Sequence, residues 1–236
     1  SRNGKALTRI IDDILDLAKV ESGKMEVEKI EFSLLELIDD VMSLFRESLQ
    51  SKGLYLRSNM SRDIPSMIVS DPTRLRQIFI NILGNAVKFT EQGGVHIDVS
   101  VRTVNDRAEF KISVSDTGIG LTPEHIERLF KPFMQADNTT TRRFGGTGLG
   151  LDLSKRLANA LGGNIEAQSN EDGKGSNFII SFSALISKNK TVEKGKLVEP
   201  IRTKELLLNN IRVLSVDDAE DNQTLIGYML RKHGAH

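Results

Sequence analysis

Two short glycine runs constrain this chain more than any other feature of its sequence. Residues 116–120 read Asp-Thr-Gly-Ile-Gly, and residues 144–151 read Phe-Gly-Gly-Thr-Gly-Leu-Gly-Leu. Glycine costs about 0.5–1 kcal/mol where it replaces a better former of helix or strand, so this density needs a local reason. Tight turns between strands and helices are one such reason. The other is a phosphate chain held by backbone N–H groups at a helix start near Gly148, which the polar, cationic segment between the runs favours.

The two most common nucleotide-binding signatures are absent from the sequence. There is no Walker loop of the form G-x-x-x-x-G-K-[ST], and no G-x-G-x-x-G follows the first strand of a βαβ unit. The catalytic-loop and D-F-G motifs of protein kinases are also missing. A nucleotide site in this chain must therefore be of a different kind.

Four segments, in order along the chain, resemble the ATP-binding boxes of the sensor histidine kinases, whose site is of the Bergerat type. They are residues 77–90 (asparagine box), 116–120 (first glycine box), 129–133 (phenylalanine box) and 145–151 (second glycine box). The resemblance implies an α+β fold, a two-layer α/β sandwich of the histidine-kinase ATPase type, with a mixed sheet covered by helices and preceded by a dimerisation helix. It also implies ATP and Mg²⁺ as cofactors and transfer of the γ-phosphoryl group to a histidine.

Composition limits the classes of protein that fit. A chain of 236 residues with 39% hydrophobic content can bury roughly 70% of its extended surface and so form a full core. Lys plus Arg and Asp plus Glu both total 32, which gives no electrostatic signature of nucleic-acid binding. The absence of cysteine excludes disulfides and thiol catalysis, and no apolar run approaches the roughly 18 residues of a membrane span. We expect a cytoplasmic location, even if the longer protein is anchored in a membrane.

The sequence divides into four regions. Apolar residues spaced as on one helix face occur between Leu7 and Ala18, and the text of residues 7–24 resembles the second helix of the kinases' dimerisation hairpin. An ordinary amphipathic helix packed on its own domain is the alternative. We assign residues 1–24 to this partial hairpin, 25–187 to the catalytic ATP-binding domain, 188–210 to a linker and 211–236 to the start of a truncated receiver domain.

Caps and periodicity predict the elements of the central region. Ser33 begins a capping box, and Asp71 followed by Pro72 marks a second helix start. Alternating apolar residues predict a hairpin with one wet and one dry face. The expected strands are 25–32, 95–101, 110–114, 165–169 and 177–184, and the expected helices are 33–49, 72–88 and 149–161. Together they predict a mixed sheet under three helices.

Asn81, Asn85 and Lys88 are spaced by four and three residues, so they line up on one face of the helix that starts at Pro72. Hydrogen bonds to another helix would account for asparagines on an otherwise apolar helix. The resemblance implies instead that Asn85 ligates Mg²⁺ and that Lys88 meets phosphates. Relatives in the same superfamily that hydrolyse ATP have a glutamate where Asn81 stands. An asparagine cannot act as a base, which favours transfer to a side chain over hydrolysis.

Asp116 ends a strand at the first glycine run, where its carboxylate could simply cap a turn. The resemblance implies that it receives the adenine amino group. The other implied nucleotide-binding residues are Gly118, Gly120, Phe130, Gly146, Thr147, Gly148, Leu149 and Gly150. Arg142 and Arg143 end a segment with the composition of a lid, and we expect one of them to contact phosphate. Asp152 departs from the pattern, because a small residue is expected after the second glycine box.

Residues 213–218 form a short buried-strand pattern that ends in Asp217 and Asp218. This pattern resembles the first strand of a response-regulator receiver, whose paired acidic residues hold Mg²⁺. A receiver's acceptor aspartate lies on a later strand, beyond the end of this sequence. The resemblance therefore implies an incomplete receiver site.

The chain contains His96, His125, His233 and His236, and none has the acidic residue and proline that follow the kinases' acceptor histidine. We expect the acceptor on the first hairpin helix, before Ser1. The expected partners are that histidine-bearing hairpin, a receiver domain and a second copy in a homodimer. The fragment would then bind Mg-ATP without phosphorylating itself. A non-catalytic dimerisation or partner-binding module on the same fold, and a superfamily ATPase, are the alternatives.

Overall fold

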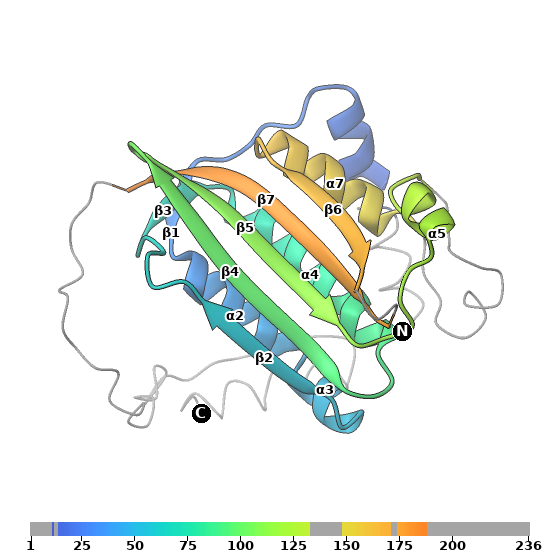
Figure 1. Ribbon diagram of the computed structural model, residues 1–236. Coiled ribbons are helices and arrows are strands. Elements are labelled where there is room, and N and C mark those ends of the chain that lie inside the picture. Colours follow the sequence, from blue (N-terminus) through green and yellow to red (C-terminus); the bar gives the residue numbers. More distant parts are fainter. Residues whose placement is uncertain (1–10, 12–13, 133–147, 171–173, 188–236) are drawn as a thin grey trace, which may run out of the picture. The chain divides into compact units, whose positions relative to one another are not determined.

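The computed structural model describes residues 11, 14–132, 148–170 and 174–187, which form one sheet with helices along one face (Figure 1). A helix over residues 14–21 comes first. The following elements, in chain order, are β1 (Ile30–Phe32), α2 (Leu34–Leu44), α3 (Arg46–Ser51), β2 (Tyr55–Met60), β3 (Ile68–Ser70), α4 (Pro72–Phe89), β4 (Gly94–Val104), β5 (Arg107–Asp116), α5 (Pro123–Arg128), α7 (Gly150–Ala160), β6 (Asn164–Ser169) and β7 (Ser176–Ile186).

The sheet is mixed, and its strand order is β1-β3-β7-β5-β4-β2. β2 and β4 run parallel, with Tyr55 opposite Gly94, and the other pairs are antiparallel. β6 pairs with the first part of β7, whereas β3 pairs with its last residues. At the β4–β5 turn Asn105 has φ of 55°, the left-handed conformation that tight hairpins use. The predicted mixed sheet and its central hairpin are confirmed by these pairings.

Three long helices cover one face of the sheet, with α4 in the middle and α2 and α7 on either side (Figure 1). α4 begins where the Asp71 carboxylate accepts the N–H of Arg74 at 3.0 Å and Pro72 takes the first helical position. Its buried face consists of Leu75, Ile78, Phe79, Ile82, Leu83, Ala86 and Val87. Among the described residues, no helix has the length and apolar character needed to cross a membrane.

The start of the domain differs from expectation. β1 covers only Ile30–Phe32, and residues 24–29 carry no regular structure. In this segment the N–H of Glu28 donates to Asp71 Oδ2 at 3.0 Å, a side-chain contact that takes the place of a strand partner. The single strand expected over 25–32 is therefore wrong at its beginning.

The helix expected over 33–49 is broken at Phe45. Its N–H donates to the Met42 carbonyl at 3.1 Å, three residues back, which tightens the last turn of α2 before α3 begins at Arg46. Two strands that the sequence does not predict follow. β2 is an edge strand with mostly exposed, polar side chains, and β3 has three residues, so neither has a readable alternation.

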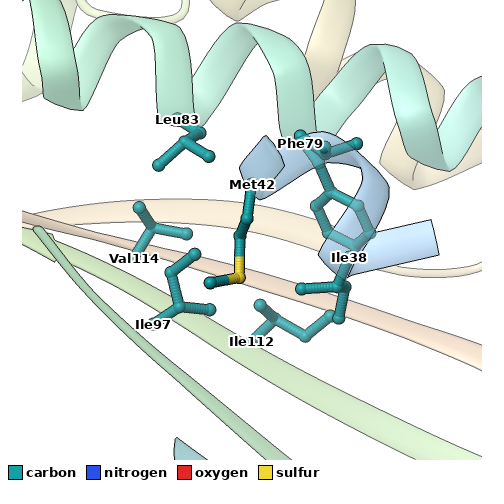
Figure 2. A pocket seen from close by; sticks show the side chains of 8 residues that line it. Ile38, Met42, Phe79, Leu83, Ile97, Ile112 and Val114 are labelled. Atoms are coloured by element: carbon teal, nitrogen blue, oxygen red, sulfur yellow. The ribbon is translucent and has the colours of Figure 1, made fainter. Parts of the chain in front are cut away.

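A small apolar cavity lies between α2, α4 and the sheet. Figure 2 shows Met42 reaching from α2 between Leu83 of α4 and Ile97 and Ile112 of the sheet. The cavity measures about 20 Å³, close to the room for a single water molecule, and its lining is almost entirely apolar. It is a gap in core packing and is far too small for a nucleotide.

The helix over residues 14–21 contacts the domain through charged side chains. Asp16 Oδ2 accepts hydrogen bonds from Arg74 Nη1 at 3.0 Å and from Gln77 Nε2 at 3.1 Å, both on α4. One turn later, Glu21 Oε1 lies 3.2 Å from Arg156 Nη2 of α7. This helix therefore connects the first turns of α4 with the middle of α7.

The apolar side chains of the same segment point elsewhere. Ile11, Ile14 and Leu15 are 48%, 45% and 53% exposed, whereas Val20 packs partly against the core. An amphipathic helix normally buries its apolar face against its own domain. The structure instead attaches this helix largely by its polar side and leaves most of its apolar side uncovered.

Candidate functional site

The polar face predicted on α4 lies beside α7. Asn81 Nδ2 donates to Ser154 Oγ of α7 at 2.8 Å. A Cβ atom placed on Gly150 would clash with the Asn81 side chain, so glycine at the start of α7 lets the two helices approach closely. The alternative of an interhelical hydrogen bond is therefore correct for Asn81, while its part in favouring phosphoryl transfer over hydrolysis stays a prediction.

Asn85 and Lys88 continue this face towards the carboxyl end of α4, and both are half-buried. Burial lowers the pKa of the Lys88 ammonium below its ordinary value, because desolvation disfavours the charged form. Lys88 Nζ also lies 4.7 Å from the centre of the Phe89 ring. A partly desolvated ammonium and an amide side chain three residues apart on one helix face are suited to a polyanionic ligand that carries a cation.

The Asp116 carboxylate, at the end of β5, is the most completely held polar group of the site. The residue is 2% exposed. Its Oδ1 accepts the N–H of Gly118 at 2.8 Å and the N–H of Ser176 at 3.3 Å, and its Oδ2 accepts Ser176 Oγ at 2.7 Å. Asn170 Nδ2 donates to the Asp116 carbonyl at 2.9 Å. The carboxylate does cap a turn, as one reading of the sequence predicts, and it also links β5 to β7.

Two glycines allow the backbone to close around Asp116. A Cβ on Gly118 would clash with the Phe89 carbonyl oxygen, and a Cβ on Gly175 would clash with the Asp116 carbonyl oxygen. Gly175 also has φ of +77°, and its N–H donates to the Gly118 carbonyl at 2.8 Å. The first glycine run therefore serves close backbone packing at the end of α4.

Ser176 and Gly175 were not identified from the sequence. Their signal was available, because a glycine directly precedes the serine that begins the last strand. Their functional neighbour, Asp116, lies 60 residues earlier, and the β5–β7 pairing brings them together. Local periodicity carries no information about such a pairing.

α7 begins at Gly150, one residue later than the expected start at residue 149. Leu149 precedes it, is 2% exposed, and no side chain caps the helix through it. Gly148 has φ of +71°, which turns the chain into the helix. The N-terminal end of α7 therefore presents backbone N–H groups next to Asn81, as an anion-binding site requires.

Asp152, whose presence was unexpected, has a structural explanation. Its carboxylate accepts the Arg156 Nε–H at 3.0 Å one turn along α7. Asp152 is 5% exposed, so this ion pair neutralises a buried charge in the first turn of the helix. Arg156 in turn reaches Glu21, as described above.

Phe130 packs partly against the core beyond α5. Lys155 Nζ of α7 lies 4.4 Å from the centre of its ring, a cation–π contact. α5 begins at a side-chain cap, where the Thr122 hydroxyl accepts the N–H of His125 at 3.2 Å. Phe130, just after α5, is thus in contact with α7 through Lys155. Gly120, in the first glycine run, has φ of +76°.

Several predicted residues lie outside the described part of the chain. These are Arg142, Arg143, Gly146, Thr147, Asp217, Asp218, His233 and His236. His96 lies on the face of β4 away from the helices, 41% exposed, with Nε2 3.0 Å from Asp98 Oδ2. His125 lies in α5, so neither described histidine lies among the residues of the candidate site.

Comparison with known proteins identifies the family. Residues 70–185 match the histidine kinase-, DNA gyrase B-, and HSP90-like ATPases. The signal transduction histidine-protein kinase BarA of Escherichia coli K12 is 40% identical over 193 residues, which are 81% of this chain and 21% of BarA. The chain belongs to the sensor histidine kinase family. The sensor protein GacS of Pseudomonas syringae is 43% identical over 177 residues, covering 75% of this chain and 19% of GacS.

Solved structures of histidine kinases share the fold. Full-length ShkA in complex with AMPPNP has a TM-score of 0.66 at 27% identity, covering 100% of this chain and 45% of that one. The catalytic domain of histidine kinase ThkA has a TM-score of 0.52 at 26% identity, covering 67% of this chain and 98% of the ThkA domain. The predicted histidine-kinase ATPase fold is confirmed. The sensor kinase chain described here spans about a fifth of the length of its relatives BarA and GacS.

Proposed function

We propose that this chain binds Mg-ATP between α4, α7 and the Asp116 turn, and transfers the γ-phosphoryl group to a histidine outside the chain. The family is one of ATPases and its named members here are histidine kinases, which supports this activity. The observation that carries the proposal is the buried Asp116 carboxylate at the end of β5. Three hydrogen bonds from the protein hold it, in a turn where glycines let the backbone approach closely.

The acceptor capacity of Asp116 supports adenine recognition. An ionised carboxylate offers about four acceptor positions, and donors from Gly118 and Ser176 use three of them. One position is left for a further N–H, which the exocyclic amino group of adenine would supply. Three fixed donors hold the carboxylate in place before the ligand arrives, so little ordering cost remains at binding.

The other end of the site fits the phosphates. The start of α7 offers backbone N–H groups and the positive end of a helix dipole, and Lys88 adds a point charge. Asn85 would hold Mg²⁺, which takes one or two protein oxygens and completes its shell with water and phosphate. When bound, the ion would neutralise charge on the transferred group. Arg142 or Arg143 would add a further phosphate contact.

Transfer is favoured over hydrolysis by Asn81. Its side chain is an amide, which does not take a proton from water as a carboxylate would, and its Nδ2 donates to Ser154 Oγ. Phosphoryl transfer depends on positioning and on charge neutralisation more than on covalent chemistry by the protein. The imidazole nitrogen that attacks would come from the histidine-bearing hairpin, because neither His96 nor His125 lies in the site.

The wider arrangement is part of the proposal. Residues 1–24 would form one helix of a dimerisation hairpin, whose partner would cover the exposed Ile14 and Leu15 and join two copies as a homodimer. Residues 211–236 would begin a receiver, with Asp217 and Asp218 holding Mg²⁺ once the domain is complete. The longer protein would then be a hybrid kinase that passes the phosphoryl group from histidine to aspartate, acting in the cytoplasm.

Nucleotide titration followed by labelling tests this function. We expect the chain to bind ATP with Mg²⁺ and to retain no acid-labile label from γ-labelled ATP. A separately produced hairpin that carries the acceptor histidine should become labelled, weakly because the covalent tether is absent. Failure to bind ATP would favour a non-catalytic module. Rapid phosphate release without the hairpin would favour a superfamily ATPase.

A further inference from the structure

The carboxyl end of α4 is capped by side chains from outside the helix. The last four carbonyls of any α-helix lack partners within it. Here the Thr90 hydroxyl donates to the Ala86 carbonyl at 2.6 Å. Lys52 Nζ donates to the Val87 carbonyl at 2.7 Å and to the carbonyls of Lys88 and Thr90 at 3.3 Å each. The Lys52 ammonium, with its three donors, therefore binds carbonyls of the last turn of α4 and of the residue after it.

Lys52 is well placed for this contact because α3 ends at it. It is the C-terminal cap of α3, and Gly53 follows with φ of +67°, which turns the chain sharply. The N–H of Leu54 returns to the Leu49 carbonyl at 2.9 Å, and both leucines are buried. The turn is thus anchored in the core, while the lysine itself is exposed and contributes nothing to that core.

The last turn of α4, which Lys52 binds, belongs to the phosphate end of the proposed nucleotide site. Lys52 bonds the backbone of Lys88 directly. The next carbonyl, that of Phe89, is in close contact with the Gly118 backbone, which bonds the Asp116 carboxylate. Movement of this last turn would therefore displace the Lys88 ammonium first and the Asp116 turn second.

We propose that Lys52 is a positioning residue for the phosphate end of the nucleotide site. It holds the last turn of α4 so that Lys88 and Asn85 keep their places when polyphosphate binds. The inference rests on the proposed ATP site. A residue that only capped the helix would affect folding. Loss of Lys52 should instead weaken the binding of the phosphates more than the binding of adenine or the stability of the fold.

The experiment compares ATP with adenosine, which lacks phosphates. Lys52→Met keeps most of the side-chain length and removes the donors, and Lys52→Arg restores a cation with donors. Lys111→Met, on an exposed lysine of β5, is the matched control. We expect Lys52→Met to weaken ATP binding about 3- to 10-fold and adenosine binding by less than about 2-fold. Lys52→Arg should recover most of the loss, and Lys111→Met should lose nothing.

Salt distinguishes positioning from long-range attraction. In about 1 M salt the Debye length is about 3 Å, so a through-space effect of the missing charge would disappear. A loss that persists there, with faster hydrogen exchange in the last turn of α4, supports positioning. Equal losses for ATP and adenosine, or no loss, would overturn the inference. Wild-type binding of ATP, measured first, separates failure of this inference from failure of the proposed function.

Discussion

The two ends of the proposed nucleotide site are built differently. The adenine end is a buried carboxylate of the sheet, and its donors come from the turn after β5 and from β7. The phosphate end consists of two helix termini, where α4 is capped by Lys52 and α7 offers uncapped N–H groups. The first is held by three protein donors before any ligand arrives and keeps one acceptor position for the adenine. The second would gain most of its partners from the ligand. Substitutions should therefore damage fold and binding together at the first end, and binding more selectively at the second.

Asp116→Ala should have the largest effect. It removes the proposed adenine contact and leaves the Ser176 hydroxyl and the Gly118 N–H without their acceptor, at roughly 1–3 kcal/mol. We expect ATP affinity to fall about 10-fold or more, with a lower free energy of unfolding. Calorimetric titration and urea unfolding measure both. Asp98→Ala, which removes an exposed carboxylate on β4, should change neither, and an unchanged ATP dissociation constant for Asp116→Ala would refute the assignment.

Gly118→Ala tests close packing at the same end. The added methyl would meet the Phe89 carbonyl and the Asp116 carboxylate, so we expect a loss of about 1–3 kcal/mol in stability and reduced ATP affinity. Gly23→Ala is the control, because its φ is +66° and no atom lies within 4 Å of the added methyl. That variant should show only backbone strain, about 1–2 kcal/mol, with ATP binding retained. Equal ATP affinities for the two variants would contradict the difference between the two ends.

Asn85→Ala should separate binding from folding. Removing the proposed magnesium ligand should reduce the Mg²⁺ dependence of ATP binding and slow phosphotransfer to a supplied hairpin, with little change in the free energy of unfolding. Asn81→Ala, on the same helix, should instead lower the unfolding free energy by about 1 kcal/mol through loss of the bond to Ser154. Asn59→Ala, an exposed residue bonded to Asp98, controls for amide removal. Full phosphotransfer by Asn85→Ala would show that the ligand lies elsewhere.

Titration of Lys88 should have the smallest effect on ATP affinity at neutral pH and a measurable effect at alkaline pH. Burial lowers its pKa from 10.5, so the ammonium and its attraction for phosphate are lost as pH rises through that lower value. We expect ATP affinity to decline at a lower pH than an ordinary lysine would give. The same shift acts with opposite sign on folding, where stability contributed by this group increases as pH rises towards 10.5. Lys88→Arg should abolish the alkaline decline, because guanidinium stays charged.

The sequence predicts the phosphate end better than the adenine end. Asn81, Asn85 and Lys88 lie on one helix, so spacing and a cap at Asp71 were enough to place them on a common face. Asp116 was found as a strand end, but Ser176, its main partner, was not. Their contact depends on the pairing of β5 with β7, which no local pattern records.

The strand predictions show the same limit. The β4–β5 hairpin alternates between buried and exposed residues, and its period is visible in the sequence. β2 lies at the edge of the sheet, where Leu56 and Met60 pack only partly against the core and the other residues are exposed, so its alternation is weak. β3 is a strand through its pairing with β1 and β7, and its three residues are too few to show an alternation of buried and exposed side chains.

The helix over residues 14–21 has a charged side and an apolar side, whose contacts respond in opposite ways to added salt. Its contacts with α4 and α7 are ion pairs through Asp16 and Glu21, which added salt screens. Association through Ile14 and Leu15 would be hydrophobic, so it would be strengthened by sulfate or phosphate salts and weakened by cooling. Ionic strength and temperature would therefore shift this one helix between its own domain and a partner helix.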